Sequence, residues 1–316
     1  MKKSIEKRIL ESKTIFSILF PLEKTRTDGF QFIIFSKLTA SISMLILTLL
    51  SSCTDVIDVP VQEGPTRLVV EASLDWEKGT QGNTQTIKLS ESSAFFDTSI
   101  QKAVTNASVT VSNDNSGASS VFTHQSNGEY VTSTFEPIIG QSYTLQINYN
   151  GELFSATETM TSVTEITDVF QDREDGFEDD VLEVHVVFTD PVEEGNNYLF
   201  KFQRRGDLLP ELEEADDEFV NGNEIDWWYE IEENEDENIL PFRAGDIVDI
   251  EMYGVSRAYY DYIDILIDQI GGVGLFEATP VAVKGNCINR TNPDNYAFGY
   301  FRLTEVVRTS YTFVEE

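Results

Sequence analysis

Short segments in which apolar and polar residues alternate follow one another through the first half of this sequence. A period of two places successive side chains on opposite faces, so each segment predicts a half-buried β-strand. The turn cluster Asn113–Gly117 and the pair Asn150-Gly151, which is typical of a tight hairpin, separate such segments. This spacing predicts a β-sandwich over residues 66–161. The expected strands are Arg67–Leu74, Thr84–Leu89, Ala107–Val111, Ser120–Thr123, Glu129–Thr134, Ser142–Tyr149 and Glu152–Thr159.

The second half, residues 162–316, predicts a β-rich domain with one helix near residues 256–270. Ser256 is suited to cap the helix, and Gly271-Gly272 is suited to end it. The apolar face of the helix consists of Tyr259, Tyr262, Ile263, Leu266 and Ile270, while Asp261, Asp264 and Asp268 form a solvated face. The expected strands are Val181–Phe188, Tyr198–Phe202, Ile225–Ile231, Asp246–Met252, Ala282–Lys284 and Phe298–Val307. The fold class is therefore mainly β.

The first 52 residues have the order of a secretion signal. Eight basic side chains precede residue 53, and the apolar run Ile42–Leu50 is followed by small residues and Cys53. This run is too short to span a bilayer, which takes about 20 apolar residues. The sequence Leu50-Ser51-Ser52-Cys53 resembles the bacterial lipobox, which implies cleavage before Cys53 and acylation of its thiol. We therefore expect a signal peptide over 1–52 and a lipid-anchored tether over 53–65.

Two alternatives stay open for this leader. Cys53 could be an ordinary buried cysteine that follows a cleaved signal peptide. A second apolar patch, Phe30–Phe35, makes the basic portion unusually long, and a misassigned start codon with translation beginning nearer Lys37 would explain it.

Acidic residues dominate the charge of the chain. There are 55 Asp and Glu against 22 Lys and Arg, so the formal net charge is -33. Such a surface repels phosphate backbones and excludes nucleic acid as a partner. The hydrophobic content of 41% excludes a charge-extended disordered chain. Without residues 1–52, the chain keeps 14 basic and 51 acidic residues, and 27 of the acids lie between residues 165 and 240.

One acidic loop carries oxygen ligands at a density that suits calcium. Hard cations prefer several carboxylate and carbonyl oxygens. The spacing departs from the EF-hand pattern, because the glycine has the wrong offset and Arg173 interrupts the acids. A solvated loop is the favoured interpretation and calcium the alternative, so no cofactor is expected. The candidate ligands are Asp172, Glu174, Asp175, Glu178, Asp179 and Asp180.

Three adjacent aromatic residues, Trp227-Trp228-Tyr229, mark a possible contact with a ligand or partner. On a strand their rings point to alternate faces, so at least one tryptophan faces away from the core. Tryptophan and tyrosine are common interface anchors. Burial of both faces is the alternative interpretation.

The residues usual in enzyme active sites are scarce. The two histidines, His124 and His185, both lie in strand-like segments. Neither a G-x-S-x-G nor an H-E-x-x-H motif occurs. We therefore expect a protein without catalytic activity. A surface hydrolase or a calcium-dependent adhesin that uses clustered carboxylates is the alternative, and it requires those carboxylates to converge in a cleft.

Three short motifs in the first half resemble immunoglobulin-like domains of the carboxypeptidase-regulatory type. They are Ala107–Val111, Gly128-Glu129-Tyr130 and Gly140–Leu145. Their glycines are suited to turns with positive φ, and Tyr130 and Tyr143 are suited to the core. Such modules are structural or bind proteins in the families that have them.

A longer series of motifs resembles the Bacteroidetes lipoproteins grouped as DUF4249, a domain family of unknown function. The resemblance implies an outer-membrane lipoprotein that accompanies a TonB-dependent receptor in nutrient uptake, at the cell surface or on the periplasmic face. It carries over no catalytic residues. The motifs are Leu68–Glu71, Ala156–Met160, Asp190-Pro191, Asn197-Tyr198, Asp217–Gly222, Tyr259–Tyr262, Gly285-Asn286 and Phe298–Phe301.

Overall fold

The computed structural model describes residues 64–94, 102–174, 176, 181–231, 233, 239–271 and 282–315. The predicted signal peptide, the lipobox and Cys53 lie outside these ranges. So do four expected calcium ligands, Asp175, Glu178, Asp179 and Asp180. Within the described ranges, no helix is both long and apolar enough to cross a membrane.

The first half of the chain forms strands at all seven predicted segments. Tyr130 and Tyr143 are 1% and 2% exposed, and Gly128 and Gly140 have φ angles of 79° and 77°. Their interpretation as core aromatics and turn glycines is confirmed. The strands are β1 (Leu68–Glu77), β2 (Gln85–Glu91), β3 (Ser108–Asn113), β4 (Ser119–Ser126), β5 (Glu129–Thr132), β6 (Ser142–Tyr149) and β7 (Glu152–Thr159).

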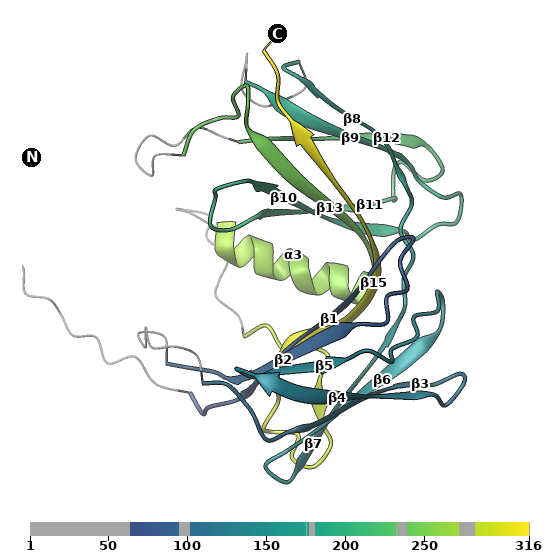
Figure 1. The fold of residues 1–316 in the computed structure, drawn as a ribbon, viewed down its shortest axis with the longest axis vertical. Coiled ribbons are helices and arrows are strands. Elements are labelled where there is room, and N and C mark those ends of the chain that lie inside the picture. Colours follow the sequence, from purple (N-terminus) through teal and green to yellow (C-terminus); the bar gives the residue numbers. More distant parts are fainter. Residues whose placement is uncertain are drawn as a thin grey trace, which may run out of the picture. The chain divides into compact units, whose positions relative to one another are not determined.

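The second half contains more strands than predicted, together with the predicted helix. The described residues are therefore mainly β, as expected (Figure 1). The elements are β8 (Ile166–Asp172), β9 (Glu183–Thr189), β10 (Asn197–Arg204), β11 (Glu211–Asp216), β12 (Glu224–Glu230), β13 (Ile247–Val255), α3 (Arg257–Gly271), β14 (Ile288–Asn289) and β15 (Phe298–Thr312).

Three strands, β8, β11 and the two-residue β14, were not predicted, and one predicted strand is wrong. The register of β8 shifts between Ile166 and Asp168, and such an irregularity breaks the period of two. Strand β11 has a single large apolar residue, so its sequence predicts an acidic loop and not a strand. The predicted strand Ala282–Lys284 has irregular backbone. Just after it, the side chain of Asn286 replaces a backbone ladder to β15. Its Nδ2 donates a hydrogen bond to the Phe301 carbonyl, and its Oδ1 accepts one from the Phe301 amide.

One long strand, β15, joins the two halves of the chain. It pairs in parallel with β1, for example at Leu74 and Leu303, and antiparallel with β13, for example at Ile250 and Thr309. The result is a sheet of twelve strands in the order β11-β10-β13-β15-β1-β2-β5-β4-β3-β6-β7-β14. A second sheet has the order β12-β9-β8. Figure 1 shows β15 bordering both β1 and β13.

The predicted boundary between residues 161 and 162 does not separate two independent sheets. Gln62–Glu316 forms one compact unit. Phe301, Leu303 and Cys287 are buried in the same core cluster as residues of β1 to β7. The end of the chain therefore completes the first core as well as the second. A parallel pair between strands more than 200 residues apart leaves no local pattern in the sequence.

The helix α3 covers part of the twelve-stranded sheet through the apolar face that the sequence predicts. Tyr259 and Ile263 are 8% and 7% exposed, and they pack in one cluster with Leu199, Tyr253 and Val306. The hydroxyl oxygen of Ser256 accepts a hydrogen bond from the Tyr259 amide at 3.2 Å, as expected of an N-cap.

Candidate functional site

A cleft lies where the edge strands of the two sheets meet. Strand β11 is the edge of the twelve-stranded sheet, and β12 is the edge of the three-stranded sheet. The cleft has a volume of about 520 Å³ and is called the edge cleft below. It is lined by Leu212, Glu213 and Glu214 of β11, by Asp226, Trp227 and Trp228 of β12, and by Ile267 of α3.

The three predicted aromatic residues differ in their surroundings. Tyr229 is 8% exposed and belongs to the core between the sheets. Trp227 stacks on Phe200, with ring centroids 5.3 Å apart, and its Nε1 donates a hydrogen bond to Glu213 at 2.6 Å. Trp228 stands opposite His185 in the ladder. Both tryptophans are partly exposed and line the edge cleft, so the strand brings two of the three residues to one open site.

Negative charge gathers at the edge cleft. Burial raises the pKa of Glu213 to about 7, and the neighbouring charges of Glu214 and Glu211 add to the shift, although the Trp227 hydrogen bond opposes it. The pKa of Glu214 is raised by burial and then by the charges of Asp264 and Asp268 on α3. The two helix aspartates, predicted to form a solvated face, therefore also contribute to the potential of the cleft.

The raised pKa of Glu213 predicts a pH-dependent stability. Between the ordinary value of 4.5 and about 7, the native state holds a proton that the unfolded chain releases. Stability therefore falls as pH rises through this window. Since one pKa unit corresponds to about 1.4 kcal/mol, the loss is at most about 3 kcal/mol.

Glu213→Gln mimics the protonated side chain, so we expect the variant to be more stable than the wild type at pH 8 and nearly equal to it at pH 5. Urea unfolding at both pH values measures the difference. Glu224→Gln, at an exposed position on the neighbouring strand β12, is the matched control and is expected to leave the wild-type pH dependence in place, because Glu224 does not contribute to the shift of Glu213. The same pH slope in wild type and Glu213→Gln would contradict the assignment.

A row of three carboxylates crosses the three-stranded sheet. Asp172 of β8 pairs with Glu183 of β9, which in turn pairs with Glu230 of β12. Glu183 is fully buried, Glu230 is 9% exposed and Asp172 is half-buried. Because residues paired across a ladder have side chains on the same face, the sheet itself brings these acids together.

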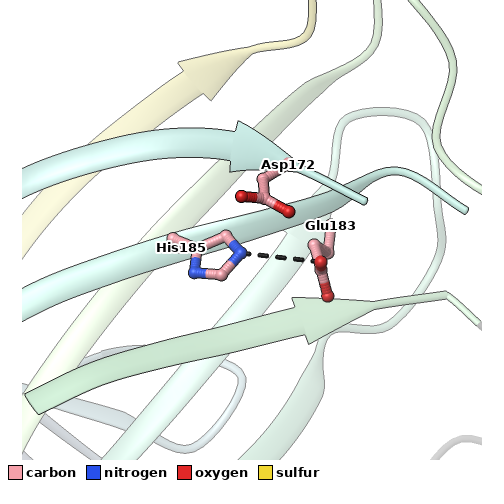
Figure 2. Close-up of side chains that lie close together, drawn as sticks. All are labelled: Asp172, Glu183 and His185. Carbon is pink, nitrogen blue, oxygen red and sulfur yellow. Dashed lines mark ion pairs between the residues drawn. The ribbon is translucent and has the colours of Figure 1, made fainter. Parts of the chain in front are cut away.

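His185 lies one step further along the same face of β9. Its side chain is fully buried and stacks on Phe170, with ring centroids 4.4 Å apart. Nδ1 is 2.8 Å from Oδ1 of Asp226, and Nε2 is 3.7 Å from Oε1 of Glu183. Figure 2 shows His185, Glu183 and Asp172 turned toward one another. One ligand atom from each of the three lies within 4.8 Å of the others.

Only part of this cluster was predicted from the sequence. Asp172 belongs to the expected calcium loop, and Glu174 of the same loop is exposed, with its amide donating to Asp172 Oδ1 at 2.6 Å. For Glu183 and His185 the sequence predicts only a strand. The one local signal for them is their spacing of two, which on a strand places a carboxylate and an imidazole on the same face.

Several residues that carry the family resemblance hold loops together. Asp190 accepts a hydrogen bond from the Tyr198 hydroxyl through one oxygen and from the Gly222 amide through the other. Oδ2 of Asp217 accepts from the amides of Gly195 and Asn196 at 2.8 and 3.0 Å. These contacts give the motifs a structural role at one end of the hairpin that β10 and β11 form.

Comparisons with known proteins identify one family. A model described as "Domain of unknown function (DUF4249)" matches residues 54–310. No curated protein matches the chain. Among solved structures, a cytokine receptor complex is similar at 10% identity over 61% of this chain and 85% of its own, with a TM-score of 0.25. A two-domain fibronectin type III segment from chicken tenascin is similar at 12% identity over 54% and 84%, with a TM-score of 0.20.

Proposed function

Because the chain belongs to the DUF4249 family, and because its leader ends in a lipobox, we propose that it is a non-catalytic outer-membrane lipoprotein of a Bacteroidetes cell. In this proposal the immunoglobulin-like residues 66–161 serve as a structural module. Lipid on Cys53 holds the chain at the membrane, with the cell surface as its expected face. Its partner is a TonB-dependent receptor that takes up nutrients.

The anchor is tested by removing the thiol that the lipid requires. Cys53→Ser is expected to abolish labelling with a fatty-acid probe and to leave the uncleaved precursor. Cys287→Ser is the matched control, because Cys287 is the buried free thiol of the described residues and is expected to leave labelling unchanged. Labelled Cys53→Ser protein would refute the anchor, and protease treatment of intact cells distinguishes the surface from the periplasmic face.

The single observation that carries the binding role is the edge cleft. It combines two partly exposed tryptophans with the carboxylates of Glu213, Glu214 and Asp226. Aromatic faces and carboxylates both attract cations, and tryptophan is a frequent anchor at interfaces. A basic segment of the partner therefore fits this cleft better than an acidic or a neutral polar one.

Co-purification tests the partner. The tagged full-length chain, extracted in mild detergent, is expected to retain a TonB-dependent receptor encoded beside it. Trp228→Ala is expected to reduce the recovered receptor at least tenfold. Val121→Ser, which changes a 63%-exposed side chain on β4 far along the sheet order, is expected to leave recovery unchanged. Equal recovery with Trp228→Ala would remove the cleft from the proposal, and no receptor with the wild type would remove the partner.

A surface hydrolase or calcium-dependent adhesin is the alternative, and the carboxylate row is the observation that favours it. Two of its three carboxylates are buried rather than arranged around an open cleft. Among the described residues, no hydroxyl or thiol forms a hydrogen bond with His185 Nε2, as a histidine-activated nucleophile would. The binding role is therefore preferred.

A further inference from the structure

We propose that Asp172, Glu183 and His185 bind one divalent transition-metal ion of the zinc class. These three residues are called the metal cluster below. The proposal is separate from the binding role of the edge cleft, because none of the three ligands lines that cleft and no membrane anchor is needed. Asp226 borders both sites, since it lines the cleft and contacts His185.

The orphan nitrogen of His185 is the first argument. Nε2 is buried and has no hydrogen-bond partner among the described residues. Buried polar atoms are nearly always paired, so an exception calls for an explanation such as an ion. The nearest carboxylate oxygen, Oε1 of Glu183, is 3.7 Å away. Zinc bonds to nitrogen and oxygen are about 2.0 to 2.2 Å long, so one ion fits between these two atoms.

The tautomer of His185 is the second argument. Oδ1 of Asp226 lies 2.8 Å from Nδ1, where a carboxylate accepts the ring proton. A proton on Nδ1 leaves the lone pair of Nε2 directed at Glu183 and Asp172. Histidines that bind metals usually donate their other nitrogen to a carboxylate in this way, and the contact orients the ring. Asp226 is thus a positioning residue for the proposed site.

The local charge is the third argument. Asp172, Glu183 and Glu230 occupy one row of paired positions, with Asp226 on the other side of His185. Carboxylates this close together repel one another when they are ionised. A divalent ion offsets two of these charges at the point where the ligand atoms converge.

The donor set selects the kind of ion. Calcium takes six to eight oxygen ligands, whereas imidazole suits zinc, copper, iron and nickel. A histidine at the centre of the cluster therefore favours a transition metal over the calcium considered for this loop. Glu183 and His185 are fully buried, so the site suits a structural ion that ties β8 to β9.

The backbone of Gly176 closes over the carboxylates. A Cβ atom at this position would lie 2.3 Å from Oε2 of Glu230 and 2.9 Å from Oε2 of Glu183. Glycine is therefore the residue that lets the chain approach these oxygens without displacing them.

The test uses the full-length chain, freed of metal with EDTA and then supplied with zinc alone. We expect one zinc per chain by mass spectrometry of metals and a higher melting temperature with zinc than without it. His185→Gln is expected to lose both the zinc and the temperature shift, and Asp226→Asn is expected to weaken zinc binding about 10- to 100-fold. Calcium at millimolar concentration is expected not to displace the zinc.

Asp168→Asn is the matched control, because Asp168 is an exposed aspartate on the same strand as Asp172. It is expected to bind zinc like the wild type. If His185→Gln does not fold, Asp172→Asn replaces it, since Asp172 is only half-buried. Absence of zinc from the wild type, displacement by calcium, or full zinc content in the variants of both His185 and Asp172 would overturn the proposal.

Discussion

Gly299→Ala is expected to lower the free energy of unfolding by about 4 kcal/mol or more, a loss that only a few mechanisms produce. Gly299 has a φ angle of 83°, which L-residues with a Cβ atom rarely adopt. An added Cβ would lie 2.1 Å from the carbonyl oxygen of Val70, its partner in the β1–β15 ladder. Backbone atoms cannot rotate away, so the pairing that joins the halves of the chain must open.

The matched control separates backbone strain from collision. Gly151 has almost the same φ angle, 81°, but an added Cβ would meet nothing within 4 Å. Gly151→Ala should therefore cost only the strain of the left-handed conformation, about 1 to 2 kcal/mol. Chemical unfolding of both variants measures the two effects. Similar losses for Gly151→Ala and Gly299→Ala would contradict the close contact between β15 and β1.

Asp75→Asn is expected to destabilise the protein by about 3 kcal/mol, because it leaves the charge of Arg302 buried and uncompensated. Arg302 on β15 is 6% exposed, and its Nη2 donates to Oδ1 of Asp75 at 2.6 Å. Its guanidinium also lies over the rings of Tyr253 and Tyr259, at 4.6 and 4.9 Å from their centroids. The ion pair thus connects β1, β13, β15 and α3.

An exposed ion pair supplies the control for this prediction. The guanidinium of Arg205 donates bidentate hydrogen bonds to the carboxylate of Asp249, but the two side chains are 55% and 46% exposed. Asp249→Asn should cost less than about 1 kcal/mol, and high salt should reduce that cost further. Urea unfolding at low and high salt compares the pairs. A smaller loss for Asp75→Asn than for Asp249→Asn would refute the role given to Arg302.

The strands could be predicted where the period of two is regular and turns are marked. This holds for β1 to β7, whose turns include Asn150-Gly151 with both residues at positive φ. The prediction fails for β8, because a register shift near Ile166 breaks the alternation of apolar and polar residues. It fails for β11 because four of its six residues are acidic, so no apolar alternation marks a strand. Acidic side chains on an edge strand also discourage pairing with another chain, which suits β11.

The metal cluster could be predicted only in part. Asp172 was identified because it begins an acidic run. His185 was not, since Val184 and Val186 on either side indicate a core strand, and these valines are indeed fully buried. The role proposed for this histidine depends on Glu183 on its own strand and on Asp226, which is 41 residues away in the chain.

The sequence by itself determined the mainly β class, the turns of the first half, the capped helix and the acidic character of the second half. These features depend on residues within a few positions of one another, so local period and turn chemistry specify them. The tertiary structure alone decided that β15 completes both cores, that β11 and β12 enclose the edge cleft, and that Glu183 and His185 meet Asp172. Each of these depends on which distant strands pair and in what register, and these pairings form only when the chain folds.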